Sequence, residues 1–474
     1  MKLENDLGRD PIRQLVLRIA IPSMLAQFVS VLYSIVDRIY IGNIPEVGGM
    51  ALAGAGVCGP IVSLIASVAF WVGIGGAPLM SIRMGEKNLP AARTILANCV
   101  LLLMALSLLL TGAALAVGRP LLLLFGASQT TLPFALAYYT PYVCGTLFAL
   151  LSIGLNQFII CQGFAKKGMQ SVLLGAGLNL ALDPLFIFGF GLGVRGAAIA
   201  TVLSQMGSCL FALRFLFSRA SPVPIVFGGY DQKIMGRVLL TGLPSFVMYA
   251  LESMMIIGLN AVLQWHGGAE RGDLLVAAGT VAQSFLILIT LPMAGITGGT
   301  NSILGYNFGA GQPGRIQEAE KYILALCLIY ASVFFLLGQF CPGTFARIFT
   351  SDPQVSALAA RAIRLCTLGV IPLAVQYVVS DGFTGVGMMH YALALSLFRK
   401  AVYFGALFVL PLAGGAVAVF SAEAVADLFP PLVSAFVYYR RQNWIAQQAC
   451  SRCQTEARPV RAEQPQLPCY QTQG

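Results

Sequence analysis

The feature that most constrains the fold is a series of long apolar runs without charge. The 21 residues Ala97–Val117 contain no Asp, Glu, Lys or Arg. As a helix, such a run is long enough to cross the hydrocarbon core of a bilayer, which is about 30 Å thick. Only 10% of all residues are charged, against about 25% in an ordinary soluble domain. The chain is therefore predicted to be an all-α integral membrane protein, and a disordered chain is excluded.

Polar breaks divide the apolar segments into twelve candidate transmembrane helices. They are expected at residues 15–41, 52–80, 94–118, 135–161, 170–190, 196–217, 238–264, 274–304, 322–340, 358–386, 401–420 and 424–439. With both termini in the cytoplasm, most of the 29 Lys and Arg residues lie on the cytoplasmic side, including Arg399 and Lys400 before the eleventh span. This distribution explains the net charge of +10 without a nucleic-acid partner. We expect a multi-pass protein of the cell membrane with cytoplasmic termini.

The two halves of the chain resemble each other. Gln157–Met169 reads QFIICQGFAKKGM and Gln376–Met388 reads QYVVSDGFTGVGM, with Gln, Gly-Phe and Gly-Met in register. Duplicated six-helix halves are typical of secondary transporters. The expected arrangement is two pseudo-symmetric six-helix bundles and two polar segments. These are an amino-terminal six-helix lobe (1–217), a cytoplasmic linker (218–237), a carboxy-terminal six-helix lobe (238–440) and a polar, disordered cytoplasmic tail (441–474).

Acidic residues inside apolar helices are the main candidates for function, because burying one costs at least about 2.5–3.5 kcal/mol. Asp37, Asp183 and Thr201 lie at similar depths below the outer ends of their helices. Asn179 and Asp183 share a helix face, as do Tyr33 and Asp37. These residues predict an oxygen-rich pocket for a proton or a monovalent cation. The alternative is a structural polar clamp between helices.

Two further acids have less certain roles. Glu252, in the middle of the seventh expected helix, is either a coupling residue or a structural one, and the role of Asp381 stays open. Arg38 either pairs with Asp37 or extends towards the membrane surface. No nucleotide-binding loop is present, and the two His residues lie on opposite sides. We therefore expect no metal site and no cofactor other than the coupling ion, H+ or Na+.

These residues together resemble the multidrug and toxic compound extrusion (MATE) transporters. The resemblance is carried by four motifs: Pro22 followed by LYSIVDRIYIG at 32–42, Asn179-x3-Asp183-Pro184, GYNFGAG at 305–311, and Gly242-x-Pro244 followed by Glu252. It implies two six-helix bundles around a V-shaped chamber, and export of organic cations driven by entry of H+ or Na+.

The resemblance also assigns site residues. It places the family's amino-lobe cation site on Asp37, Asn179, Asp183 and Thr201, with Tyr33 as a neighbour, and a possible carboxy-lobe coupling acid on Glu252. A second carboxy-lobe acid used by one branch falls near Leu373, which is not acidic, and Asp381 is two turns away. This departure favours the amino-lobe site.

The leading hypothesis is a monomeric secondary active multidrug efflux antiporter that exchanges cationic amphipathic compounds for H+ or Na+. The intramembrane charges identified at this stage are acidic, and aromatic residues can add cation–π contacts, so lipophilic cations are the expected substrates. One alternative is a lipid-linked precursor flippase of the same superfamily, which would need basic residues in its chamber. A membrane-embedded enzyme would need a nucleophile or metal cluster at one membrane face, and the sequence shows none. The sequence does not distinguish H+ from Na+.

Overall fold

The computed structural model describes residues 5–125, 131–349 and 353–456, and every regular element in these segments is a helix. In chain order the elements are α1 (Ile12–Gly42), α2 (Gly48–Val57), α3 (Gly59–Gly85), α4 (Leu89–Leu124), α5 (Leu132–Cys144), α6 (Thr146–Cys161), α7 (Ala165–Pro184), the π turn η1 (Leu185–Gly189), α8 (Val194–Leu216), α9 (Gln232–Gly309), α10 (Pro313–Phe340), α11 (Pro342–Phe349), α12 (Pro353–Cys366), the 3-10 turn η2 (Thr367–Gly369), α13 (Val370–Gly385), α14 (Met389–Gly414), the 3-10 turn η3 (Ala416–Phe420) and α15 (Ser421–Glu456).

The helices confirm the twelve-span architecture. Among the described residues, eleven segments are long and apolar enough to cross a membrane, and the bent pair α5–α6 makes the twelfth. This pair bends by 57°, so the fourth expected span is not straight. The bend lies at Gly145, which packs so closely on Val202 that a Cβ there would collide with it. The seventh and eighth spans join at Gly268, whose φ of 63° is in the left-handed region that glycine adopts without strain.

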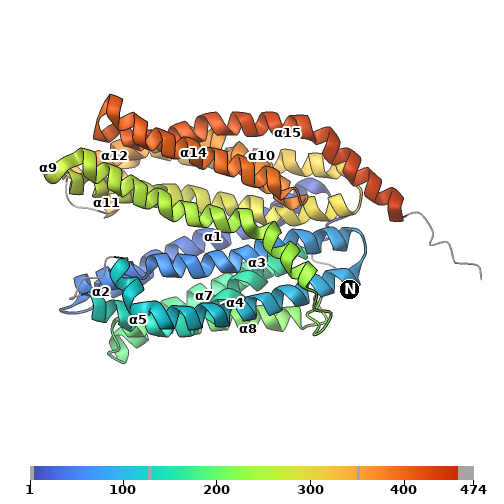
Figure 1. Cartoon of the computed structure of the whole chain (residues 1–474), viewed down its shortest axis with the longest axis horizontal. Helices are drawn as coiled ribbons and strands as arrows, with labels where there is room; N and C mark the ends of the chain where they lie inside the picture. Colours follow the sequence, from blue (N-terminus) through green and yellow to red (C-terminus); the bar gives the residue numbers. More distant parts are fainter. Residues whose placement is uncertain (1–4, 126–130, 350–352, 457–474) are drawn as a thin grey trace, which may run out of the picture.

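Two hydrophobic cores lie in two helix bundles (Figure 1). We call α1–α8 the amino lobe and α9–α15 the carboxy lobe. The buried first half of α1, including Leu15 and Ile19, packs into the core of the carboxy lobe, whereas Ile41 at its other end belongs to the core of the amino lobe. Helix α1 therefore contacts both lobes, and it carries Asp37 on the half that lies in the amino lobe.

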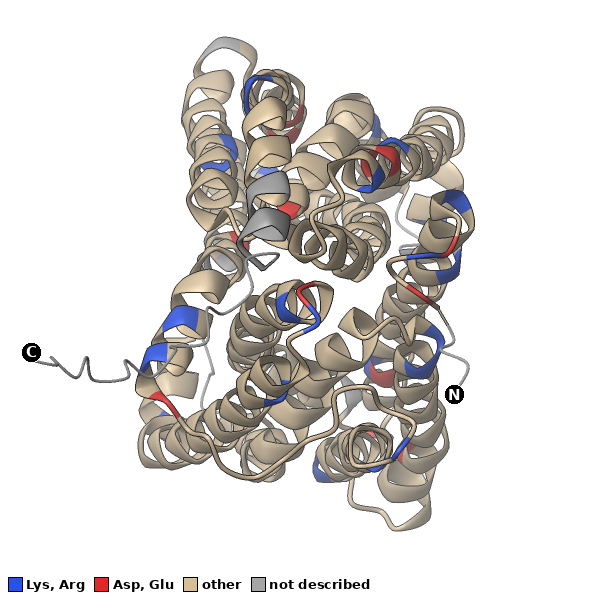
Figure 2. Ribbon diagram, turned by 90° about the vertical axis from the view of Figure 1, so that its right-hand side faces the viewer, with Lys and Arg blue, Asp and Glu red and all other residues tan. Residues whose placement is uncertain are grey.

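Both ends of the chain lie at one end of the molecule, which we call the terminal end (Figure 1). Viewed from there, Lys and Arg lie on helix ends and connecting segments of both lobes (Figure 2). The expected disordered tail is wrong for residues 441–456, which continue α15. Arg, Gln and Ala are good helix formers and extend a helix that is already formed. Residues 457–474 lie outside the described part of the chain.

Helices α3 and α9 hold the lobes together towards the terminal end through very close backbone contacts, which we call the glycine seam. At each contact a glycine lies against a backbone carbonyl of the opposite helix. The pairs are Gly75 with Val238, Gly85 with Tyr306, Gly242 with Trp71, and Gly309 with Ile82. A Cβ on any of these glycines would collide with that carbonyl, so any side chain there would push the two helices apart.

Residues 5–11, which we call the strap, also connect the lobes at the terminal end. The Asn5 side chain donates a hydrogen bond of 2.6 Å to the carbonyl of Gly163 in the amino lobe. On the carboxy lobe, Arg315 donates to the carbonyls of Leu7 and Asp10 at 3.2 and 2.9 Å. The strap therefore crosses the boundary between the lobes by hydrogen bonds, and its Leu7 is also buried in the hydrophobic core of the carboxy lobe.

Candidate functional site

A cavity of about 540 Å³ lies between the two lobes. Helices α1, α3, α6, α7 and α8 line it on one side, and α9, α13 and α14 line it on the other. This volume is in the range of pockets that bind drug-sized molecules. Phe70 of α3 stacks on Tyr249 of α9 with ring centroids 5.0 Å apart, and both rings line the cavity. The cavity thus combines aromatic surface from both lobes with the polar groups described below.

The amino lobe brings Asp37, Asn179, Asp183 and Thr201 together, and we call this group the amino-lobe acid site. The Asn179 amide nitrogen donates to Asp183 Oδ1 at 3.0 Å and to Thr201 Oγ1 at 3.5 Å. The carboxyl groups of Asp37 and Asp183 lie within hydrogen-bonding reach of each other. Two carboxylates at this separation cannot both keep an uncompensated negative charge. A proton or a cation bound between them would relieve this repulsion.

The two acids have no basic partner in the part of the chain that the structure describes. Asp183 is completely buried, and one oxygen of each carboxyl group, Asp37 Oδ1 and Asp183 Oδ2, is buried without a hydrogen bond. Arg38 is exposed and pairs with neither acid. Its position agrees with the expectation that its side chain extends outwards.

Local backbone structure positions the amino-lobe acid site. Asn179 and Asp183 lie one turn apart on α7, and α7 ends at Pro184, which has no N–H to continue the helix. The chain then widens into the π turn η1. Tyr33 lies one turn before Asp37 on α1 and lines the cavity together with Asn179 and Thr201. The site is therefore adjacent to the cavity, and its acids lie behind the cavity wall.

Tyr138 of α5 is a member of this site that the sequence did not indicate. Its hydroxyl lies within hydrogen-bonding reach of Thr201 and near the carboxyl group of Asp37, and only 7% of the residue is exposed. It also stacks on Tyr142 with ring centroids 5.9 Å apart. No spacing rule connects a tyrosine on α5 to an acid on α1, because only the tertiary packing brings them together.

The carboxy lobe corrects the expected position of Arg399 and Lys400. Both were expected in a cytoplasmic loop, but α14 begins at Met389 and places them within a span, with 7% and 2% of each residue exposed. Adjacent basic residues interrupt an apolar run and therefore look like the edge of a span. Here acidic side chains from other helices neutralise them, so the helix continues through them. Both residues line the cavity, so its charges are not only acidic.

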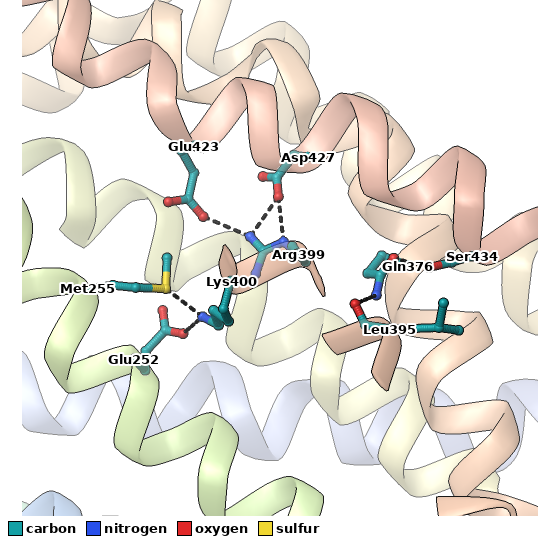
Figure 3. A network of polar contacts seen from close by, with 9 residues as sticks. All are labelled: Glu252, Met255, Gln376, Leu395, Arg399, Lys400, Glu423, Asp427 and Ser434. Carbon is teal, nitrogen blue, oxygen red and sulfur yellow. Dashed lines mark hydrogen bonds and ion pairs between the residues drawn. The ribbon is translucent and has the colours of Figure 1, made fainter. Parts of the chain in front are cut away.

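Glu252 does not resemble the acids of the amino lobe, because it is paired. The Lys400 ammonium donates to Glu252 Oε2 and contacts the Met255 sulfur at 2.8 Å (Figure 3). Arg399 pairs with Glu423 and Asp427 of α15 (Figure 3). Glu423 and Asp427 are not among the acids expected to be functional. The signal that could have identified them is their i, i+4 spacing, which places both on one face of a helix.

Asp381 lines the same cavity on the wall formed by the carboxy lobe. The hydroxyl of Thr297 on α9 donates a hydrogen bond to Asp381 Oδ2. In the described residues no Lys or Arg pairs with Asp381. Its surroundings are thus those of a polar wall residue that is separate from the Arg399 and Lys400 pairs.

Comparisons with known proteins support this reading of the fold. The MatE family model matches residues 22–185 and 244–407, one match in each half. The multidrug export protein MepA of Staphylococcus aureus is 21% identical over 437 residues, which cover 91% of this chain and 94% of that protein. An FAD transporter of Shewanella oneidensis is 26% identical over 425 residues, which cover 87% and 90%.

Solved structures share the whole architecture. One is an outward-facing multidrug resistance transporter of the MATE family, with a TM-score of 0.86, 23% identity and coverage of 93% of this chain and 98% of that chain. A second, from Pyrococcus furiosus, has the same TM-score, identity and coverage, and its description reports a binding pocket of reversed polarity. At these sequence identities, the similarity to the solved structures shows a shared fold and nothing more.

Proposed function

Because this chain belongs to the MatE family of multidrug efflux transporters, we propose that it is a secondary active antiporter that exports cationic amphipathic compounds in exchange for H+ or Na+. As a member of this family it is a membrane transporter and not an enzyme. The relatives match over nearly the full chain. The coupling ion, the substrate class and the residues involved are the subject of the proposal.

The amino-lobe acid site is the observation that carries the coupling proposal. Asp37 and Asp183 lie side by side and form no ion pair with a described Lys or Arg; the charge of Arg38 acts on Asp37 only from a distance, which favours a compensating cation from solution. A proton or Na+ bound between the acids would fill this role, and Asn179 and Thr201 would supply neutral oxygen atoms. Release of that ion restores negative charge next to the cavity.

The cavity supports cationic amphipathic substrates. Phe70, Tyr249 and Tyr377 offer aromatic faces to a lipophilic cation, and Glu252 and Asp381 supply negative charge or hydrogen-bond acceptors. The carboxyl of Glu252 faces the cavity, with 55% of its side chain exposed, whereas Lys400 lies behind it. A positively charged ligand would therefore meet the acid before it met the lysine.

The orientation and the oligomeric state complete the proposal. The positive-inside rule places the terminal end, with its Lys and Arg residues, in the cytoplasm. The lobes are joined on that side by the glycine seam and the strap, so the structure fits an outward-facing state. Each chain contains a complete cavity and a complete acid site, which supports a monomeric transporter.

A second candidate substrate is an anionic flavin dinucleotide. Two basic residues of the cavity wall, Arg399 and Lys400, favour it, and an FAD transporter is among the relatives. The same residues remove one argument against a lipid-linked precursor flippase, for which basic chamber residues were expected. Both bases, however, are already paired with acids. An anionic ligand would have to compete with those carboxylates, so we rank cations first.

Transport in proteoliposomes tests the proposal. The purified chain is reconstituted, and transport of a fluorescent lipophilic cation is followed under an imposed pH gradient or an imposed Na+ gradient, each varied separately. We expect one gradient to drive transport and an ionophore that collapses it to stop transport. FAD is offered as a competitor in the same assay. Transport that does not respond to either gradient would refute the antiporter. Inhibition by FAD but not by cations would favour the second candidate substrate.

A further inference from the structure

The carboxy lobe contains a charged cluster around Arg399, and the proposed function does not use its two acids on α15, Glu423 and Asp427. Arg399 Nε donates to Asp427 Oδ1 at 2.7 Å, and Arg399 Nη2 lies 2.6 Å from the same oxygen and 2.8 Å from Glu423 Oε1 (Figure 3). One guanidinium nitrogen thus contacts both carboxyl groups. The two acids are one helical turn apart on α15 and face the same partner. Glu423 and Asp427 must therefore lie close to each other.

The charges of this cluster do not balance. Its cations are Arg399 and Lys400, and its acids are Glu252, Glu423 and Asp427. With all five groups ionised, one negative charge remains uncompensated. Asp427 is completely buried, and only 12% of the Glu423 side chain is exposed. An excess charge inside a membrane protein is strongly unfavourable, and uptake of one proton removes it.

Two buried oxygen atoms next to the cluster have no partner in the described part of the chain. One is Asp427 Oδ2, and the other is the hydroxyl of Tyr403, of which only 1% is exposed. Tyr403, Glu423 and Gln283 line a small space of about 10 Å³. This is close to the volume that a single water needs, and the three side chains offer it polar partners. The unpartnered tyrosine hydroxyl therefore points to a water molecule beside Glu423.

Packing around Asp427 discriminates between a proton and a larger ion. Gly369 of η2 lies directly against Asp427, and a Cβ at residue 369 would collide with the aspartate side chain. Neither the central cavity nor the small space beside Glu423 includes Asp427 in its wall. A proton needs no such space, whereas Na+ would need several oxygen ligands around it.

Other side chains face the two acids from every neighbouring helix. They are Glu252 from α9, Cys366 from α12, Tyr377 from α13, and Arg399, Lys400 and Tyr403 from α14. Glu320 of α10 interacts with α15 only at Tyr438, further along that helix. Cysteine and tyrosine are neutral near pH 7 in their ordinary state. The charge balance at neutral pH is therefore set by the three acids and the two bases.

We propose that the carboxy lobe contains a proton-binding site in which Glu423 and Asp427 share one proton against Arg399, with a water in the small space beside Glu423 as its route of exchange. The site is separate from the amino-lobe acid site. Because Arg399 and Lys400 line the central cavity, the proton also sets the net charge behind that wall. The five-residue cluster is neutral with the proton bound and carries one negative charge without it.

Infrared spectroscopy of the purified full-length chain tests the site without any transport assay. A protonated carboxyl group absorbs at a carbonyl frequency that carboxylates lack. We expect the spectrum at neutral pH to lose about one such group's intensity in either Glu423→Gln or Asp427→Asn. The matched control is Asp231→Asn, because Asp231 is exposed and caps α9, and Asn can cap a helix equally well. This control should leave the band unchanged.

Two variants keep the test decisive. Asp427→Asn removes the main acceptor of a buried arginine, and if it fails to give a monodisperse protein, the more peripheral Glu423→Gln carries the result. If folded Glu423→Gln and every folded form of Asp427→Asn keep the full band at all pH values, the proton site is wrong. That result would leave the proposed function unaffected, because gradient-driven transport is argued from the amino-lobe acids. Conversely, loss of the band in a chain that ignores both gradients would support the site and refute the antiporter.

Discussion

The two lobes bury acidic residues in opposite ways. In the amino lobe, Asp37 and Asp183 contact each other, and no described Lys or Arg pairs with them. In the carboxy lobe, Arg399 and Lys400 on neighbouring positions of α14 pair with three acids from two other helices. The repeated architecture thus contains one acid pair without a basic ion-pair partner and one cluster in which two bases meet three acids.

This difference indicates how coupling can be confined to one half of a duplicated transporter. An acid that has a basic partner to itself, as Glu252 has in Lys400, gains less from binding a proton or Na+ than two acids without an ion-pair partner. Glu252 therefore fits a coupling role less well in the structure than its position in the sequence suggested. Its direct pairing with Lys400 makes it part of the carboxy-lobe cluster.

The largest contrast is expected in transport. Asp183→Asn or Asp37→Asn should reduce gradient-driven efflux of a lipophilic cation at least about tenfold, because each removes half of the acid pair that we propose binds the coupling ion. Glu252→Gln should reduce it by a smaller factor. Efflux from proteoliposomes at matched protein content is the measurement. Rates near the unmodified level in both aspartate variants would show that the amino-lobe acid site is not the coupling site.

The next contrast concerns stability. Arg399→Met leaves Glu423 and Asp427 buried without their partner, and we expect it to lower the free energy of unfolding by about 3–5 kcal/mol. Asp183→Asn leaves no basic group without its partner, so it should leave the free energy of unfolding unchanged or raise it. Thermal unfolding in detergent provides the comparison.

The control for this stability test is Arg361→Met. Arg361 is exposed on α12, so its replacement should change stability by less than about 0.5 kcal/mol. Equal destabilisation by Arg399→Met and Arg361→Met would mean that the carboxy-lobe ion pairs contribute nothing.

The pH dependence of substrate binding should distinguish the role of the amino lobe from that of the carboxy lobe. Protonation of the amino-lobe acids removes negative charge beside the cavity, so acid pH should weaken equilibrium binding of a cationic dye, by about 5- to 150-fold if H+ is the coupling ion. Asp37→Asn should abolish most of this dependence, and Glu252→Gln should retain it. Fluorescence binding in detergent across pH and Na+ concentration is the measurement. A flat affinity in both titrations of the unmodified protein would exclude direct exchange.

The smallest expected effect is a rescue within the carboxy lobe. Glu252→Gln leaves Lys400 buried without its carboxylate, and Lys400→Gln removes the counter-charge of Glu252. The double variant should recover about 0.5–3 kcal/mol of the summed loss in unfolding free energy, at the lower end because Glu252 is half exposed. Additive effects would show that the pair is not coupled. The double variant of Asp37 and Asp183 to Asn should show no comparable rescue.

The parts of the molecule that the sequence predicted depend on local signals. Apolar runs gave the spans, because a helix in a membrane needs only a continuous apolar length. The i, i+4 spacing of Asn179 and Asp183 and the depth of Asp37 predicted an acid cluster, and the structure brings these residues together with Thr201.

The parts that could not be predicted depend on long-range packing. The partner of Lys400 is Glu252, 148 positions away, so the lysine looked like a loop residue. Tyr138 reaches Thr201 only because α5 packs on α8. The bend at Gly145 likewise follows from its contact with Val202. In each case the deciding neighbour comes from another helix, and no pattern within one segment can reveal it.

The glycine seam has a consequence for the speed with which the lobes can separate. At its four contacts a backbone carbonyl meets a residue without a side chain, so at these four points no side chain has to change rotamer when α3 moves away from α9. Interlocked leucines in these positions would add a barrier to every cycle. The contacts that must break include polar ones: Trp71 and Ser81 of α3 donate hydrogen bonds of 2.7 and 2.8 Å to carbonyls of α9, and the strap adds its own hydrogen bonds. In a transporter built in this way, changes in a few polar contacts can alter the rate at which the lobes separate, while the glycine seam itself stays the same.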